Sequence, residues 1–228
     1  MNSSFNSSSP ANRALRLAAA AGAALLLCAC AARPVTQIDY TAFREHRPRS
    51  ILVMPPVNQS PEINAATSFL ATSTRPLAES GYYVIPVTLS EETFKQNGMM
   101  VAEEAQAVEL KKLRDIFGAD AALYITITRF GTSYRLVDSV VEATASARLV
   151  DLRSGQNLWS GQAAVALGGN NSGGGLIGAL VSAVVNQIAN TISDKAHDVG
   201  RMANYQMLSA GRPNGILFGP YHPRSGTD

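Results

Sequence analysis

Residues 140–167 read VVEATASARLVDLRSGQNLWSGQAAVAL, and this stretch decides the fold. From Val140 to Leu152, and again from Asn157 to Leu167, apolar residues alternate with small or polar ones. A period of two residues is typical of a strand with one buried face. Asp151–Gln156 separates the two runs, and its Asp and Gly residues are typical of a hairpin turn with Gly155 in the left-handed conformation. The stretch therefore predicts two antiparallel strands.

Strands alternate with helices in the chain before this hairpin. Residues 121–130 also alternate with a period of two, and two short apolar runs at 50–54 and 82–87 are typical of buried strands. Helical periodicity occupies the segments between the strands, namely residues 65–80, 90–96 and 102–117. Ser90 is the expected N-cap of the second helix, and the third is expected to be continuous.

The order of these elements predicts one α/β domain. A strand, a helix, a strand and two helices lead to three consecutive strands and a last helix. Helical crossovers give parallel neighbours, whereas hairpins give antiparallel ones. We therefore expect a mixed sheet of about five strands, with two parallel crossovers and then an antiparallel meander. Helices should flank the sheet, and a long C-terminal helix should follow it.

An uncharged segment runs from residue 154 to residue 193. Its glycines Gly173, Gly175 and Gly178 satisfy the G-x-G-x-x-G spacing of dinucleotide sites, but no βαβ unit begins there, so no cofactor is expected. Residues 176–192 predict the first part of the long helix, with an apolar stripe that is a candidate partner-binding surface. The stripe consists of Leu176, Ile177, Leu180, Val181, Val184, Val185 and Ile188. Whether it packs on its own sheet, on a partner helix or on a membrane surface is left open.

Residues 1–29 have the composition of a lipoprotein signal peptide. Arg13 and Arg16 precede an apolar run that is too short to span a bilayer. The run ends in Leu-Cys-Ala-Cys at residues 27–30, which is similar to the bacterial lipobox. Cys30 is the expected lipidation site, because the small Ala29 precedes it at the cleavage point. This pattern predicts a membrane contact through an N-terminal lipid anchor.

The residue after Cys30 gives the expected destination. Ala31 stands where an Asp would favour retention in the inner membrane, so we expect the outer membrane and its periplasmic face, with surface exposure left open. Residues 30–48 are expected to be the lipidated Cys and a tether, because Pro34 and Pro48 interrupt a weakly periodic sequence. The α/β domain is expected over residues 49–211, with an extended tail over 212–228 that docks on its own domain or on a partner.

Composition excludes several kinds of function. The 228 residues carry a formal net charge of +2, and both excess positive charges lie in the signal peptide, so a nucleic-acid-binding protein is not expected. Two Cys and three scattered His give no metal-ligand spacing. No G-x-S-x-G or H-E-x-x-H motif occurs, and we expect no enzyme and no metal site. Trp159, the lone Trp, is a candidate contact residue with core packing as its alternative role.

Several motifs resemble those of known lipoproteins. Residues 149–161 resemble a hairpin of curli-assembly secretion lipoproteins (CsgG-like) and of penicillin-binding-protein activator lipoproteins. A wider match over about residues 40–221 is similar to the GNA-type bacterial lipoprotein family, whose function is unknown. The segments that carry it are Tyr40–Phe43, Pro48–Val53, Pro76–Val84, Phe117–Ala121, Asp194–Asp198 and Gly215–Pro220. The resemblance implies an α/β domain similar to the amino-terminal domain of the Tol-system propeller protein, and it implies no catalytic residues.

Two functions follow as expectations. The first is a non-catalytic binding or assembly module on the outer membrane, accessory to a CsgG-like secretion or envelope complex, as the resemblance implies. A CsgG-like lipoprotein is then the expected partner, and a homo-oligomer is left open. The alternative is an auxiliary lipoprotein of an envelope lipid or ABC-type transporter, which would need an apolar groove for acyl chains.

Overall fold

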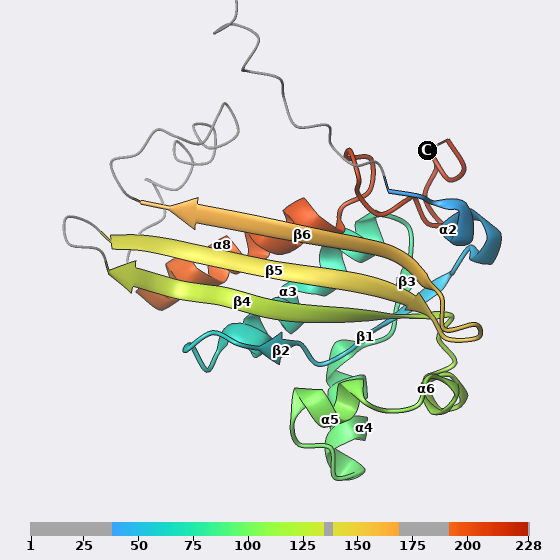
Figure 1. Cartoon of the computed structure of the whole chain (residues 1–228), viewed down its shortest axis with the longest axis horizontal. Helices are drawn as coiled ribbons and strands as arrows, with labels where there is room; N and C mark the ends of the chain where they lie inside the picture. The colour runs from blue at the N-terminus through green and yellow to red at the C-terminus, as the bar shows by residue number, and fades with distance from the viewer. Residues whose placement is uncertain (1–37, 135–138, 169–191, 228) are drawn as a thin grey trace, which may run out of the picture. The chain divides into compact units, whose positions relative to one another are not determined.

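One mixed sheet forms the centre of the described part of the chain (Figure 1). A computed structural model describes residues 38–134, 139–168 and 192–227, all within one unit of residues 38–228. The strands are β1 (Ser50–Val53), β2 (Val57–Asn58), β3 (Tyr83–Val84), β4 (Ala121–Tyr134), β5 (Ser139–Asp151) and β6 (Asn157–Leu167). The helices are α2 (Thr41–His46), α3 (Ala65–Glu79), α4 (Val87–Gln96), α5 (Ala102–Gln106), α6 (Leu110–Phe117) and α8 (Ile192–Leu208).

The strand order β3-β1-β4-β5-β6 confirms the predicted mixed sheet. β1 pairs in parallel with both β3 and β4, and β4–β5–β6 is the expected antiparallel meander. The short β2, which the sequence analysis does not predict, adds a sixth strand parallel to β4. The β5–β6 turn also has the predicted geometry: Gly155 has a φ of +75°, and its N–H donates to the Asp151 carbonyl at 2.9 Å.

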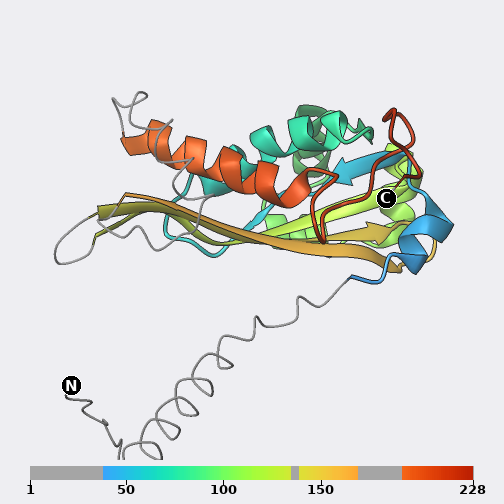
Figure 2. The ribbon, with the colours of Figure 1, turned by 90° about the horizontal axis from the view of Figure 1, so that it is seen from above.

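Two helices cover one face of the sheet. Figure 2 shows α3 and α8 lying together on the same side of the strands. Alternate β4 residues Leu123, Ile125 and Ile127 are fully buried in the core beneath them. Asn204 on α8 donates to the Phe69 carbonyl of α3 at 2.9 Å, so the helices are joined by polar as well as apolar contacts. This layer confirms the expected packing of the C-terminal helix for residues 192–208.

Three short helices cover part of the opposite face. α4, α5 and α6 pack on a second apolar cluster that contains Leu52, Tyr124 and Val150. The prediction of one continuous helix over residues 102–117 is wrong. The chain leaves the helix after Gln106, whose side chain donates to the Pro55 carbonyl at 2.8 Å, and α6 then turns to bury Leu113.

The start of α4 also differs from the prediction. The helix begins at Val87, and its N-cap is Pro86 rather than Ser90. Proline has no N–H to donate to a strand ladder and favours the start of a helix, so β3 ends after Val84 instead of reaching residue 87. Ser90 is buried within α4, where its hydroxyl donates to the Val87 carbonyl at 3.0 Å.

Both flanking segments of the domain pack on it. Residues 38–48, expected to be tether, contain α2, and Phe43 of that helix is 4% exposed in the core. The tail docks on its own domain, which is one of the two arrangements expected from the sequence. Ile216 is buried, the Tyr82 hydroxyl donates to the Leu217 carbonyl at 2.6 Å, and the Gly219 N–H donates to the Ser80 carbonyl at 2.8 Å.

Candidate functional site

The face of β4–β6 that points away from α3 and α8 is open over much of its area, and Figure 1 looks onto it. Its side chains form cross-strand rows because the strands are paired in register. One row contains Thr126, Ser146 and Gln162, and the next contains Arg129, Thr144 and Ala164. We call this surface the open face. It consists of Thr126, Arg129, Glu142, Thr144, Ser146, Arg148, Ser160, Gln162, Ala164 and Ala166.

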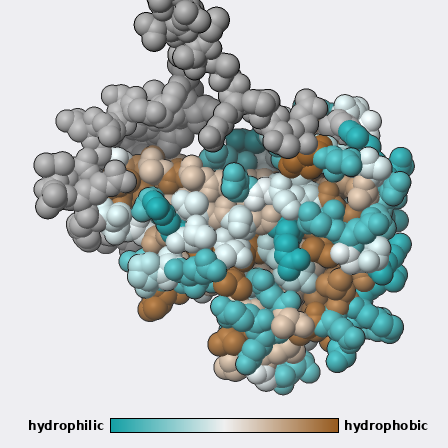
Figure 3. Space-filling model, viewed as in Figure 1, coloured by the Kyte–Doolittle hydropathy of each residue, from teal (hydrophilic) through white to brown (hydrophobic). Residues whose placement is uncertain are grey.

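Small and uncharged side chains dominate the open face. The β6 residues Ser160, Gln162, Ala164 and Ala166 are all exposed. In Figure 3 the middle of this surface is mostly pale or tan, with separate teal patches. A partner could approach the backbone of these strands closely, because few long side chains stand in its way. The surface therefore suits broad contact with a macromolecule better than enclosure of a small ligand.

A shallow hollow of about 930 Å³ lies at one end of the open face. Arg148 stands over the Tyr124 ring there, with its guanidinium carbon 4.3 Å from the ring centroid. Burial raises the pKa of the Tyr124 hydroxyl, although the Arg148 charge acts in the opposite direction. The phenol is therefore neutral at physiological pH. Gln106, Ser146 and Gln162 add polar groups to the same hollow, so its lining is mixed rather than apolar.

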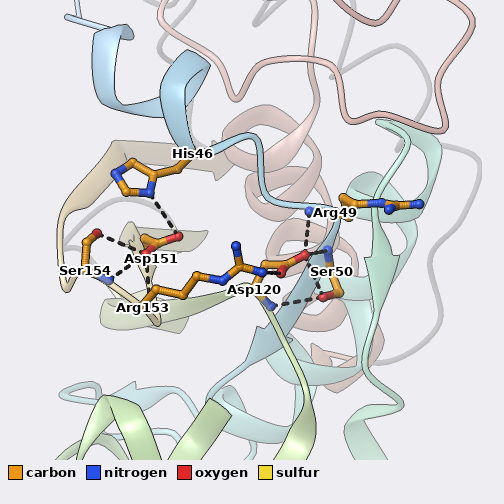
Figure 4. A network of polar contacts seen from close by, with 7 residues as sticks. All are labelled: His46, Arg49, Ser50, Asp120, Asp151, Arg153 and Ser154. Carbon is orange, nitrogen blue, oxygen red and sulfur yellow. Dashed lines mark hydrogen bonds and ion pairs between the residues drawn. The ribbon is translucent and has the colours of Figure 1, made fainter.

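A polar network holds the hairpin corner beside this hollow (Figure 4). Asp151, which is 2% exposed, accepts from the Arg153 N–H at 2.9 Å and from the Ser154 N–H at 2.7 Å. His46 of α2 lies 3.4 Å from the second Asp151 oxygen. Burial acts to raise the pKa of Asp151, but the hydrogen bonds from Ser154 and Arg153 and the His46 charge together lower it. Asp151 is therefore ionised and fixes the turn to α2.

A second carboxylate extends the network to the sheet (Figure 4). Asp120 accepts from the backbone N–H groups of Arg49 and Ser50 at 3.0 and 3.2 Å, and from the Arg153 guanidinium at 3.0 Å. The hydroxyl of Ser50 in turn accepts from the Asp120 N–H at 3.0 Å. The two carboxylates therefore have their lone pairs occupied by main-chain and side-chain donors. These contacts tie β1, the hairpin and α2 together, and neither carboxylate lines the hollow.

The described residues contain no cluster of three His, Cys, Asp or Glu able to hold a metal ion. A Ser–His contact does occur, with the Ser68 hydroxyl 2.8 Å from His197 Nδ1. It joins α3 to α8, and neither residue lines the hollow on the open face. The Asp198 carboxylate beside His197 pairs with Arg201 at 3.0 Å. The pair therefore has the geometry of a helix–helix contact rather than a nucleophile and its base.

The predicted site residues have different placements. Trp159 is 1% exposed, and its indole N–H donates to the Asn214 carbonyl at 3.0 Å, so its proposed role as a contact residue is not supported by its position. Core packing, the alternative, accounts for it. Cys30 and the stripe of residues 176–188 lie outside the described residues. Their roles stay predictions. In the part of the chain that the model describes, no helix is long and apolar enough to cross a bilayer.

Sequence reasoning did not identify the open face or the hairpin network. The alternation of residues 140–167 shows which residues share a face, but it does not show where α4–α6 end on that face. His46 and Asp151 are 105 positions apart in the chain, so their contact has no local signal. The Asp-x-x-Ser-Gly pattern at residues 151–155 does predict the turn, although not its contact with α2.

The comparisons with known proteins agree with a lipoprotein and with the α/β fold. A lipoprotein of Neisseria meningitidis serogroup B (strain ATCC BAA-335 / MC58), NMB1124/NMB1162, is 52% identical over 198 residues, which are 87% of this chain and 92% of that protein. The crystal structure of lipoprotein GNA1162 from Neisseria meningitidis is 58% identical with a TM-score of 0.52, covering 63% of this chain and 100% of that one. The chain is thus of the lipoprotein class.

The family follows from a match over most of the domain. The chain belongs to the family described as "Putative lipoprotein GNA1162-like", whose model matches residues 38–221. This confirms the resemblance found in the sequence. A PelC dodecamer from Paraburkholderia phytofirmans is 13% identical with a TM-score of 0.42, covering 70% of this chain and 84% of that one. A likeness at that level supports no inference about the function or assembly of this chain.

Proposed function

We propose that the protein is an outer-membrane lipoprotein, anchored through Cys30, whose domain works in the periplasm as a non-catalytic binding or assembly module. The open face is the observation that supports this proposal most directly. It presents three long strands, mostly with small side chains, on a surface that α4–α6 cover only in part. Sheets usually bury both faces or expose one polar face, and a partly covered face with Ala at exposed positions suits protein contact.

β6 extends the binding surface to the edge of the sheet. It pairs with β5 on one side, and no strand among the described residues pairs along its other side. Its eleven residues carry no charged side chain and no proline. Charged residues and prolines are the usual means of protecting an edge strand, so this edge favours strand addition by a partner.

The resemblance of the 149–161 hairpin makes a CsgG-like lipoprotein the proposed partner. The apolar stripe of residues 176–188 is a second proposed contact, reached from the end of β6. The alternative function, an auxiliary lipoprotein of an envelope lipid or ABC-type transporter, has less support, because the hollow on the open face has a mixed polar lining.

Photo-crosslinking in intact cells tests the open face. A crosslinking residue at Gln162 or Ala164 should give a discrete adduct, and one at the exposed Lys112 of α6 should not. The double variant Ala164→Glu and Ala166→Glu should abolish the adduct, because two carboxylates would have to be buried in the contact. Mass spectrometry identifies the partner. The same adduct from Lys112, or an unchanged adduct in a folded double variant, would refute this surface.

Two further variants test the remaining parts of the proposal. Palmitate labelling of the wild type and of Cys30→Ala should differ, and equal labelling would exclude Cys30 as the anchor. Leu180→Asp combined with Val184→Asp should reduce partner capture if the stripe is a contact surface. Retention of every partner by that folded variant would show that the stripe has another role.

A further inference from the structure

Four arginines gather where the chain enters the domain. Arg44 of α2 and its C-cap Arg47 line one hollow of the tail region, and Arg44, Arg212 and Arg224 line the next hollow, of about 290 Å³. All four side chains are exposed. We call this set, Arg44, Arg47, Arg212 and Arg224, the arginine surface. Figures 1 and 2 both show α2 beside the C-terminal residues.

Local contacts hold Arg47 and Arg224 in place without neutralising them. The Arg224 guanidinium carbon lies 4.3 Å from the Phe218 ring centroid, and the Arg47 Nε donates to the Arg44 carbonyl at 3.0 Å. Neither aromatic stacking nor a carbonyl acceptor removes the positive charge. Among the described residues, no carboxylate forms an ion pair with Arg47, Arg212 or Arg224.

The nearby carboxylates offset only part of the charge. Asp39 accepts from the Thr41 N–H and hydroxyl at 2.9 and 2.6 Å, keeps its negative charge and acts on Arg44. Glu79 is paired with Arg75 at 2.8 Å. Glu45 is the acid of α2, which contains Arg44 and has Arg47 as its C-cap. The four arginines outnumber Asp39 and Glu45, so the surface is net positive, and Arg47, Arg212 and Arg224 have guanidinium groups available to an anion.

The same corner receives the chain from the anchor. The Ile38 N–H contacts the Asn214 side-chain oxygen at 3.4 Å, and the Tyr40 hydroxyl donates to the Gly215 carbonyl. Arg212 lies two residues from that contact. Eight residue steps separate Cys30 from Ile38, so an extended chain spans at most about 28 Å between lipid and domain. The arginine surface thus lies at the corner where a tether from Cys30 would join the domain.

We infer that the arginine surface binds the phosphate groups of anionic phospholipids in the leaflet that holds the anchor, and so fixes the orientation of the domain on the membrane. The inference rests on the proposed anchor at Cys30. Arginine forms bidentate hydrogen bonds to phosphate, and each basic residue near an anionic leaflet adds to the attraction. The open face would then be presented to partners in a fixed direction rather than at random.

A fluorescent reporter on the full lipidated protein tests this docking. Ser225, which lines the hollow with Arg44 and Arg47, is changed to Cys and labelled with an environment-sensitive dye. In vesicles of phosphatidylcholine with about one third phosphatidylglycerol, the emission should shift to shorter wavelength, and about 0.5 M NaCl should reverse the shift. A dye at Glu103→Cys on α5 should not respond. No shift in these vesicles, or a shift that high salt leaves unchanged, would overturn the inference.

Docking of charge-removal variants and the response to free phosphate test the inference further. The triple variant Arg44→Gln, Arg212→Gln and Arg224→Gln should lower the docked fraction by roughly an order of magnitude. Its matched control, Lys111→Gln, Lys112→Gln and Arg114→Gln on α6, should dock like the wild type. Equal loss in both variants would overturn the inference, as would a response to inorganic phosphate in pure phosphatidylcholine vesicles that equals the response to phosphatidylglycerol.

Retention of the protein on vesicles tests the lipid anchor separately from the docking of the arginine surface. Wild type should stay with pure phosphatidylcholine vesicles, where the dye shows no docking. Loss from those vesicles would contradict the lipid anchor, and with it the inference. Stable retention with an identical dye signal in both kinds of vesicle would contradict the docking alone.

Discussion

The two faces of β4–β6 are built from the same three strands, yet they differ in almost every physical property. Residues such as Leu123, Ile125 and Leu149 on one face are fully buried beneath α3 and α8. On the other face, the positions that α4–α6 leave open carry Ser, Thr, Gln and Ala together with Arg129, Glu142 and Arg148. The comparison shows that one face supplies most of the folding free energy of this sheet. The open face therefore contributes less to stability, which leaves its side chains available for the proposed contact.

The substitution with the largest expected effect on stability removes an aromatic ring from the covered face. Phe69→Ala should lower the free energy of unfolding by about 3–5 kcal/mol, because Phe69 is fully buried and packs against Phe130 and Gly200. Urea denaturation of the mature protein measures the change. A cost below about 1 kcal/mol would mean that the covered face contributes less than the packing indicates.

A substitution at the hairpin corner tests whether polar contacts contribute as much to the unfolding free energy as apolar packing does. Asp151→Ala should cost about 2 kcal/mol, since three donors from Arg153 and Ser154 lose a charged acceptor. Asp151 has a pKa below its ordinary value of 3.8, so its ionised form stabilises the fold above that value. This contribution should disappear as the pH falls through the lowered pKa.

Asp151→Asn isolates that pH dependence. The difference in unfolding free energy between wild type and Asp151→Asn should be constant near neutral pH and shrink below about pH 4. A difference that grows on acidification would contradict the sign of the shift.

Substitutions at two neighbouring positions of β6 compare the stability contributions of the two faces directly. Gly161 lies on the covered side, where an added Cβ would overlap the Trp159 ring, so Gly161→Ala should cost about 1–3 kcal/mol. Ser160→Ala, one position away on the open face, is the matched control. Equal costs for the two variants would show that the indole can move aside.

The smallest expected effect lies on the open face itself. Gln162→Ala and Ala164→Ser should each change the unfolding free energy by less than about 0.5 kcal/mol, because both side chains are exposed. Thermal unfolding is a sufficient measurement. A loss above about 1 kcal/mol would indicate that this face is covered within the protein's own fold.

Much of the fold could be predicted from periodicity. The strands at residues 121–130, 140–152 and 157–167 were identifiable from a period of two, and the strand at 50–54 from a short apolar run, because both patterns require only local residues. The residues at which helices begin and end were harder to predict. Pro86 moves the start of α4, and the side chain of Gln106 reaches Pro55, 51 positions earlier. A contact of that kind depends on tertiary structure, which a single sequence does not show.

The functional surfaces were less predictable for a related reason. A partly covered sheet face is defined by where helices end, and the arginine surface combines residues that are about 170 positions apart. By contrast, Cys30 could be proposed from four consecutive residues, because a peptidase recognises an extended segment.

The joining of the two ends of the domain has a consequence for how the chain matures. Ile38 and Tyr40 contact Asn214 and Gly215, partners that are made at least 175 residues later. A chain synthesised from its N-terminus cannot close this corner before residues 214 and 215 have been made. The last contacts of the segment before α2 are therefore among the latest of the domain to form. A fragment that lacks residues 214 and 215 would leave this segment without those partners.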